Sequence, residues 1–598
     1  MKPLYRYLAA AALGAGALFS GYRMLQLDQF GQLWGHLPLV FFLCAWLAIA
    51  LLWLPRACRE PGRWRRIGLS TLSGLLLSAG FPPSLLTPLM FVGFVPLLMA
   101  GAELDEHPGP GKREWFALTY HSFVLWNILT TFWVANSALM AGLLAMTINA
   151  GFMTVPWLLY RRSQRYIPRL AGLALIAFWI SFEYIHLRWD LTWPWLTLGN
   201  AFAEHPSWVQ WYEYTGVFGG SLWILLANLL IFQIWQRYRQ PGQGVPPVRW
   251  LALAACLLAP LGGSLVRYYT FESHTTTGPT EIVVVQPNFE PHYEKFNVPD
   301  DRQLERFLHL ADSAVTPQTR VLVFPETSFG PLRDRELGKD RLTRKLQQYV
   351  DQHPQLELIA GLSVYHLFAN DEPRTPYVRS RVRTPGDTLF WESYNAAVQF
   401  VPGRDTVPIY RKSKLVPGAE FLPYRRIFFF LEPLVNKLDG SIAGLGVQPS
   451  RSVFTDANGI GYAPVICYES VFGEYHTGYI RAGAQVGLIM TNDGWWDNTA
   501  GHKQHLRYAS LRAIETRRPF ARAANTGISA FIDQRGDIHQ PTAYNEAVAV
   551  RGTVLPNDRI TFYVRWGDLI GRLALFTAIV LLLNNFVKGR LRKGGASE

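Results

Sequence analysis

Long apolar runs alternate with short polar connections over the first 270 positions of the chain. Each run is close to the roughly 20 residues with which a helix crosses a bilayer. The first run is expected to remain as an anchor rather than a cleaved signal peptide, because its loss would move the basic connection 55–66 across the membrane. With one more run near the end, the pattern predicts ten spans: 4–22, 38–54, 67–81, 87–101, 117–136, 139–160, 170–187, 216–236, 250–268 and 566–586.

Residues 271–560 contain no such run and alternate short apolar segments with amphipathic stretches. The amphipathic stretches 300–315, 338–352 and 503–517 are expected to be helices. Strands that alternate with helices predict a layered α/β domain. The expected buried strands are Ile282–Val285, Val321–Phe324, Leu356–Leu362, Ala396–Val401, Ala463–Cys467, Val486–Thr491 and Ile528–Ile532.

These patterns divide the chain into four regions. The first region, 1–60, holds two N-terminal spans, and the second, 61–270, is a helical membrane domain. An α/β domain follows in 271–560, and a last span with a basic tail in 561–598. Lys and Arg are concentrated in the tail and in the connections 55–66, 161–169 and 237–249. Because such residues stay in the cytoplasm, both termini are expected there. In a bacterium, the α/β domain would then face the periplasm from the inner membrane.

The composition supports a membrane protein. Apolar residues make up 49% of the chain, charged residues 17% and aromatic residues 14%, which excludes a disordered chain. The net charge of +13 would be compatible with a nucleic-acid partner, but many of the basic residues flank the apolar runs, so a membrane is expected instead. The four cysteines exclude a disulfide scaffold. The aromatic stretch 188–210 fits either a belt at the bilayer surface or a surface for lipid entry.

Three charged or nucleophilic side chains follow predicted strands of the α/β domain. Cys467, the only cysteine of that domain, ends an apolar run, which favours a reactive thiol over a buried inert one. Glu326 follows the run Val321–Phe324, and Lys412 is followed by a further carboxylate, Glu420. Taken singly, such charges are more commonly solvated strand ends. Together they form a nucleophilic set, in which a carboxylate accepts the thiol proton and an ammonium stabilises an oxyanion.

The segments Phe324-Pro325-Glu326, Tyr410-x-Lys412 and Ile466-Cys467-Tyr468-Glu469 resemble the Glu-Lys-Cys triad of the nitrilase (carbon–nitrogen hydrolase) superfamily. So does Thr491-Asn492-Asp493-Gly494-Trp495. Over about residues 67–586 the chain resembles the bacterial apolipoprotein N-acyltransferase family, including Trp193-Pro194-Trp195-Leu196 in its membrane part. It departs from that family at Pro417-Gly418-Ala419-Glu420, usually Pro-Phe-Gly-Glu, and at Lys414, commonly a His.

The resemblance implies a multi-span α-helical membrane domain joined to an α/β nitrilase-like domain, a layered α-β-β-α sandwich. It implies Glu326 as general base, Lys412 as the oxyanion-stabilising cation and Cys467 as nucleophile. The supporting residues would be Glu420, Tyr468, Glu469, Asn395 and Trp495.

The implied activity is an acyl transfer in two steps. A phospholipid would give its acyl chain to Cys467 as a thioester, and the N-terminal diacylglyceryl-cysteine of an apolipoprotein would then accept it as an amide. No cofactor, metal or nucleic acid is expected, and the protein is expected to be a monomer. His502 and His505 show no metal-binding pattern and are interpreted as surface or core residues.

Two other functions remain open at this point. A membrane-tethered amidase of the nitrilase type would use the same three residues, with water as the acyl acceptor. A transporter with an outward binding domain would place ionisable residues inside its spans, and Glu183 is the one candidate that stands out, although it could equally line a lipid cavity.

Overall fold

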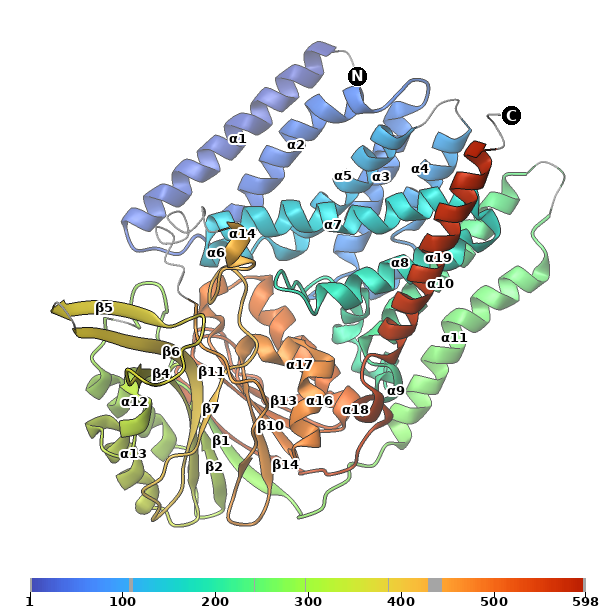
Figure 1. Ribbon diagram of the computed structural model, residues 1–598. Helices are drawn as coiled ribbons and strands as arrows, with labels where there is room; N and C mark the ends of the chain where they lie inside the picture. Colours follow the sequence, from blue (N-terminus) through green and yellow to red (C-terminus); the bar gives the residue numbers. More distant parts are fainter. Residues whose placement is uncertain are drawn as a thin grey trace.

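A computed structural model describes residues 3–106, 111–240, 242, 244–295, 297–384, 387–428 and 444–594. The apolar helices gather on one side of the molecule and the β-sheets on the other (Figure 1). The first and the last described residues of the chain both lie far from the sheets (Figure 1). Residues 595–598 of the predicted basic tail lie outside the described residues.

Each predicted apolar run coincides with a helix. Eight described helices are long and apolar enough to cross a membrane, judged by length and composition alone. Of the other two, α3 has only 17 residues and α5 is long enough but not apolar enough. The ten helices are α1 (Pro3–Gln29), α2 (Leu37–Ala57), α3 (Arg63–Ala79), α4 (Val95–Asp105, after a short helix at Thr87–Phe91), α5 (Lys112–Thr131), α7 (Leu139–Tyr166), α8 (Ala171–His186), α10 (Val217–Tyr238), α11 (Pro247–Thr270) and α19 (Leu569–Gly594).

Two mixed β-sheets form the second part of the molecule. The first has the order β14-β1-β2-β4-β6-β5, with β3 beside β4 and β7 beside β6, and the second has the order β13-β12-β11-β10-β9-β8. The strands of the first are β1 (Thr280–Gln286), β2 (Thr319–Val323), β3 (Phe329–Arg333), β4 (Glu357–Phe368), β5 (Arg379–Thr384), β6 (Asp387–Phe400), β7 (Ile409–Arg411) and β14 (Val548–Val554). Those of the second are β8 (Phe454–Thr455), β9 (Gly461–Ile466), β10 (Val486–Thr491), β11 (Phe520–Ala524), β12 (Ala530–Ile532) and β13 (Ile538–His539).

The two sheets pack face to face. Since neighbouring residues of a strand point to opposite faces, each strand sends one set of side chains to the other sheet and the alternate set to the covering helices. Ile282 and Val284 of β1 share a core with Val465 and Leu488 of the second sheet. Val283 and its neighbours on the other face pack against α12 (Asp300–Asp312) and α13 (Arg341–Asp351). On the outer face of the second sheet lie α16 (Gly473–Arg481) and α17 (Ala500–Thr516). The α-β-β-α sandwich is confirmed, and every predicted strand and helix of this domain is found.

Helix α17 joins the two parts of the molecule. Its residues Ala509 and Ala513 belong to the core of the second sheet, whereas Leu511 and Ile514 belong to the core of the apolar helices. Within the predicted aromatic stretch 188–210, most of residues 192–203 are buried at the same junction. The rings of this inner part fill the contact between the two parts of the molecule and form no exposed belt.

Candidate active site

Cys467 lies directly after β9 and begins a short helix, Cys467–Val471. Its backbone φ is +46°, in the left-handed region that a residue with a side chain rarely adopts. Such a sharp turn between a strand and a helix presents the side chain at the end of the sheet. The residue is 9% exposed.

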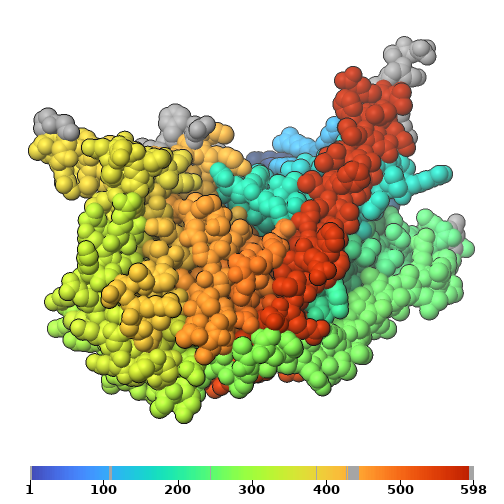
Figure 2. Space-filling model, turned by 60° about the horizontal axis from the view of Figure 1, so that its bottom comes forward, coloured from blue at the N-terminus to red at the C-terminus, as the bar shows by residue number. Residues whose placement is uncertain are grey.

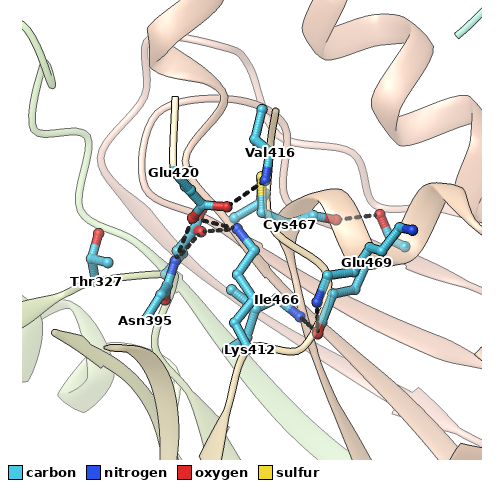
Figure 3. Close-up of polar contacts among 12 residues, drawn as sticks. Thr327, Asn395, Lys412, Val416, Glu420, Ile466, Cys467 and Glu469 are labelled. Atoms are coloured by element: carbon cyan, nitrogen blue, oxygen red, sulfur yellow. Dashed lines mark hydrogen bonds and ion pairs between the residues drawn. The ribbon is translucent and has the colours of Figure 1, made fainter. Parts of the chain in front are cut away.

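The predicted ammonium of Lys412 lies beside this cysteine (Figure 3), and the predicted carboxylate of Glu326 pairs with it. Lys412 Nζ lies 3.1 Å from Glu326 Oε1 and 2.8 Å from Glu420 Oε1. Asn395, on β6, donates from Nδ2 to Glu326 Oε1 over 2.7 Å. Strands β2, β6, β7 and β9 thus bring these predicted residues to one place, where each side chain is mostly or fully buried.

The electrostatics distinguish the lysine from the thiol. Burial lowers the pKa of Lys412, but the carboxylates of Glu326 and Glu420 outweigh burial and raise it well above the ordinary lysine value. Burial raises the pKa of the Cys467 thiol, and the negative charge of Glu326 raises it further, against the effect of Lys412. The site therefore holds a cation and a protonated thiol, which needs a base in order to react.

The loop Pro417–Glu420 directs the carboxylate of Glu420 toward Lys412. Gly418 has a φ of +81°, a conformation that glycine adopts without strain. Glu420 closes the turn twice, since its N–H donates to the Val416 carbonyl over 2.9 Å and its Oε2 accepts from Val416 N over 2.7 Å. This turn leaves Oε1 for Lys412.

Glu469 links two segments of the site and does not face the thiol. Its Oε1 accepts from the hydroxyls of Tyr410 at 2.6 Å and Tyr475 at 2.8 Å and from Ser413 N at 2.8 Å. Its Oε2 accepts from Ile466 N at 2.9 Å. The fully buried carboxylate therefore ties the segment of Lys412 to that of Cys467.

The other two supporting residues contact the membrane part. Tyr468 donates its hydroxyl to the Thr192 carbonyl over 3.0 Å. The ring of Trp495 lies 5.1 Å from that of His292, and its carbonyl accepts from Ser137 of the short helix α6 (Val134–Ser137). Tyr468 thus adjoins the thiol directly, whereas Trp495 contacts the loop around His292 and α6.

A buried charge network next to Cys467 was missed. His505 Nε2 lies 2.8 Å from Ser470 Oγ and 3.2 Å from the Cys467 carbonyl, and its Nδ1 lies 2.9 Å from Asp493. Arg522 pairs with the other oxygen of Asp493 at 2.6 Å. The sequence did contain a signal for this network, because Arg522 stands in the middle of the otherwise apolar strand β11. Among the residues that the structure describes, no His, Cys, Asp and Glu side chains are grouped to hold a metal ion.

Comparison with known families matches two regions of the chain. Residues 73–230 match the apolipoprotein N-acyltransferase N-terminal domain, and residues 284–551 match the carbon-nitrogen hydrolase family. The second region contains all three residues of the predicted triad.

Relatives are similar over most of their length. The apolipoprotein N-acyltransferase of Chlorobaculum tepidum is 30% identical over 535 residues, which cover 87% of this chain and 97% of the relative. That of Geobacter metallireducens is 26% identical over 519 residues, covering 84% and 91%.

Solved structures of the nitrilase superfamily match about half of the chain. Nit3 from Saccharomyces cerevisiae has a TM-score of 0.33 and 13% identity, over 49% of this chain and 94% of that protein. An amidase from Nesterenkonia sp. has a TM-score of 0.32 and 17% identity, over 49% and 96%.

Proposed function

The chain belongs to the apolipoprotein N-acyltransferase family, and on this premise we propose that it transfers an acyl chain from a phospholipid to the N-terminal diacylglyceryl-cysteine of an apolipoprotein. The family and the apolar helices indicate a lipoprotein acyltransferase that is a multi-pass bacterial membrane protein. One observation above all supports a thioester on Cys467. Glu326, Lys412 and Glu420 converge at the strand end that carries this thiol.

In the first step, Glu326 takes the thiol proton as Sγ attacks the ester carbonyl of the phospholipid. Lys412 stabilises the oxyanion that forms, a contribution typically worth 10²–10³ in rate. The carbon–oxygen bond then breaks, and the proton on Glu326 goes to the leaving oxygen. The products are a lysophospholipid and a thioester on Cys467.

In the second step, the α-amino group of the lipoprotein attacks the thioester carbonyl. Its reference pKa of about 7.7–8.0 leaves part of it neutral at pH 7. Glu326 accepts the amine proton, the carbon–sulfur bond breaks, and the thiol recovers its proton. An ester and an amine have become an alcohol and an amide, with no other reactant.

We further propose that the nitrilase-like domain faces the periplasm from the inner membrane and that the protein acts as a monomer. The basic connections support this orientation, and so does the position of the start of α1 and the end of α19, both far from the sheets (Figure 1). The contact between Tyr468 and Thr192 supports a site beside the membrane part, where limited access of water would protect a thioester from hydrolysis.

The test uses purified protein, a phospholipid labelled in its acyl chain and a diacylated lipopeptide. The proposal predicts label on the N-terminal amine of the lipopeptide, and none with Cys467→Ala. An acetylated lipopeptide, which has no free amine, is the matched control. Release of labelled fatty acid at the same rate with and without the lipopeptide would instead identify a hydrolase.

A further inference from the structure

A polar cavity, separate from the candidate active site, lies at the sheet-side ends of the apolar helices. Its volume is about 190 Å³. Its walls come from α9 (Tyr212–Thr215), the end of α11 and the segment before α18 (Phe562–Trp566). Figure 2 shows the segment that follows α11, in green, beside the red segment of α18 and α19 on this face.

The cavity carries an excess of positive charge. Arg267, Arg517 and Arg559 line it, against one carboxylate, Glu213. Two of these guanidiniums already share that carboxylate, since Arg267 Nε and Arg517 Nε each lie 2.9 Å from a Glu213 oxygen. His274, also in the wall, lies 3.6 Å from Asp558. Arg559 is exposed, so its charge is available to a ligand.

The two inner arginines are held in place before any ligand arrives. Arg517 is almost fully buried and donates to Gln210 and to the Gln534 carbonyl. The guanidinium carbons of Arg267 and Arg517 lie 5.0 Å and 4.4 Å from the centre of the Phe271 ring. Arg517 already donates from Nε, from both hydrogens of Nη1 and from Nη2, so it holds Glu213 and the wall of the cavity in place. A phosphate would be bound by Arg267 and Arg559, because a guanidinium can donate two N–H groups to its oxygens at once.

The rim of the cavity fits a membrane surface. Tyr214, Ile560 and Phe562, which line it, are 53%, 48% and 45% exposed, and Trp566 of α18 is 52% exposed. Aromatic side chains of this kind favour the level of the lipid headgroups. The cavity is large enough for several water molecules of about 30 Å³ each, but it is smaller than the roughly 300–1,000 Å³ of pockets that take whole drug-sized ligands. It has room for one small charged group.

We propose that this cavity binds the phosphate of a phospholipid headgroup, as a lipid site separate from the catalytic one. The acyl chains would lie along the exposed apolar surface of the rim. The site is distant from the thiol, because His505 and Arg517 lie twelve residues apart along and just beyond α17, which corresponds to roughly 18 Å. It would hold a lipid that is not consumed.

The test is photo-crosslinking with phosphatidylglycerol that carries a diazirine near its headgroup. The full chain with Cys467→Ala is used, so that acyl transfer cannot contribute. After digestion with trypsin, label is measured on the peptides that contain residues 268–274 and 560–562. Competitors are unlabelled phosphatidylglycerol, diacylglycerol with the same chains and no phosphate, and inorganic phosphate.

We expect competition by phosphatidylglycerol and none by diacylglycerol. Arg559→Gln should weaken this competition about tenfold, the usual effect of losing one charge-assisted hydrogen bond. Arg559→Lys should largely restore it, and Arg551→Gln, an exposed arginine on β14, should not change it. Labelling of the peptide with residue 467 reports that each variant is folded.

Equal competition by diacylglycerol, or an unchanged affinity in Arg559→Gln, would overturn the proposal. Displacement by millimolar inorganic phosphate alone would identify a site for free phosphate rather than for a lipid. None of these outcomes depends on the acyl-transfer activity, so failure here and failure of the proposed function are distinguishable.

Discussion

The hydroxyl of Tyr468 donates a hydrogen bond to the Thr192 carbonyl oxygen over 3.0 Å and so joins the residue after the thiol to the membrane part of the chain. Both residues are buried. The ring of Tyr468 also lies 6.2 Å from that of Trp195, in the same aromatic stretch. The Cys467 loop is therefore positioned by the membrane part as well as by strand β9.

Tyr468→Phe should lower the free energy of unfolding by about 1–3 kcal/mol, because it leaves a buried carbonyl without its donor. The ring and its packing are retained. Chemical denaturation in detergent measures the effect, with Tyr269→Phe as control, since Tyr269 is 78% exposed. Equal stabilities of the two variants would mean that the Thr192 contact contributes nothing.

Lys412→Met should slow acyl loading of the enzyme at least about 100-fold, because the oxyanion loses its cation. Arg at this position should not restore the rate, since its planar group does not match the two carboxylates that enclose a single ammonium. Single-turnover loading measures the rate, and Lys339→Met, an exposed position, is the control. Loading of Lys412→Met at the rate of the control would exclude an oxyanion role.

Asp493→Asn should destabilise the fold by about 3–5 kcal/mol, because it leaves the guanidinium of Arg522 buried without a counter-charge. Both side chains are completely buried. The double variant Asp493→Asn/Arg522→Met should recover part of this loss, which denaturation of both variants would measure. An additive loss in the double variant would argue against a paired charge.

The stability contributed by Lys414 should depend on pH. Burial and the nearby charges of Arg188 and Arg451 lower its pKa to about 8, with Asp190 opposing them. Unfolding then takes up a proton between about pH 8 and the ordinary lysine value of about 10.4, so that stability rises with pH in that interval.

Lys414→Met should therefore stabilise the protein most below pH 8, and the gain should disappear toward pH 10. Thermal unfolding of both proteins at pH 6.5 and pH 9.5 measures the difference. The Phe472 ring, which lies 4.8 Å from the ammonium, can pack against the methionine. A gain that is the same at both pH values would show that the lysine charge is not responsible.

The helices and central strands could be predicted because each depends on a local pattern. Runs such as Val486–Thr491 of β10 are buried on both faces and apolar throughout. The edge strand β14 was missed, since its partner β1 lies more than 250 residues away and only one of its seven residues is fully buried. The burial of residues 192–203 was also missed, because it depends on a partner surface supplied by α17.

The position of the candidate site residues at strand ends could be predicted, but their meeting could not. The lengths of the strands indicate that Glu326 and Cys467 follow β2 and β9. The order of strands in two separate sheets decides that they converge, and local sequence does not encode that order. The role of Glu469 in joining three tyrosines and two backbone segments likewise depends on tertiary contacts.

The central claim is that Cys467 carries the acyl chain. Intact mass spectrometry of the purified protein, after incubation with a phospholipid of defined chains, tests it most directly. We predict one added acyl mass that hydroxylamine removes, that a diacylated lipopeptide discharges, and that is absent from Cys467→Ala. An adduct of the same yield on folded Cys467→Ala, or lipopeptide acylation by that variant at the wild-type rate, would contradict the account.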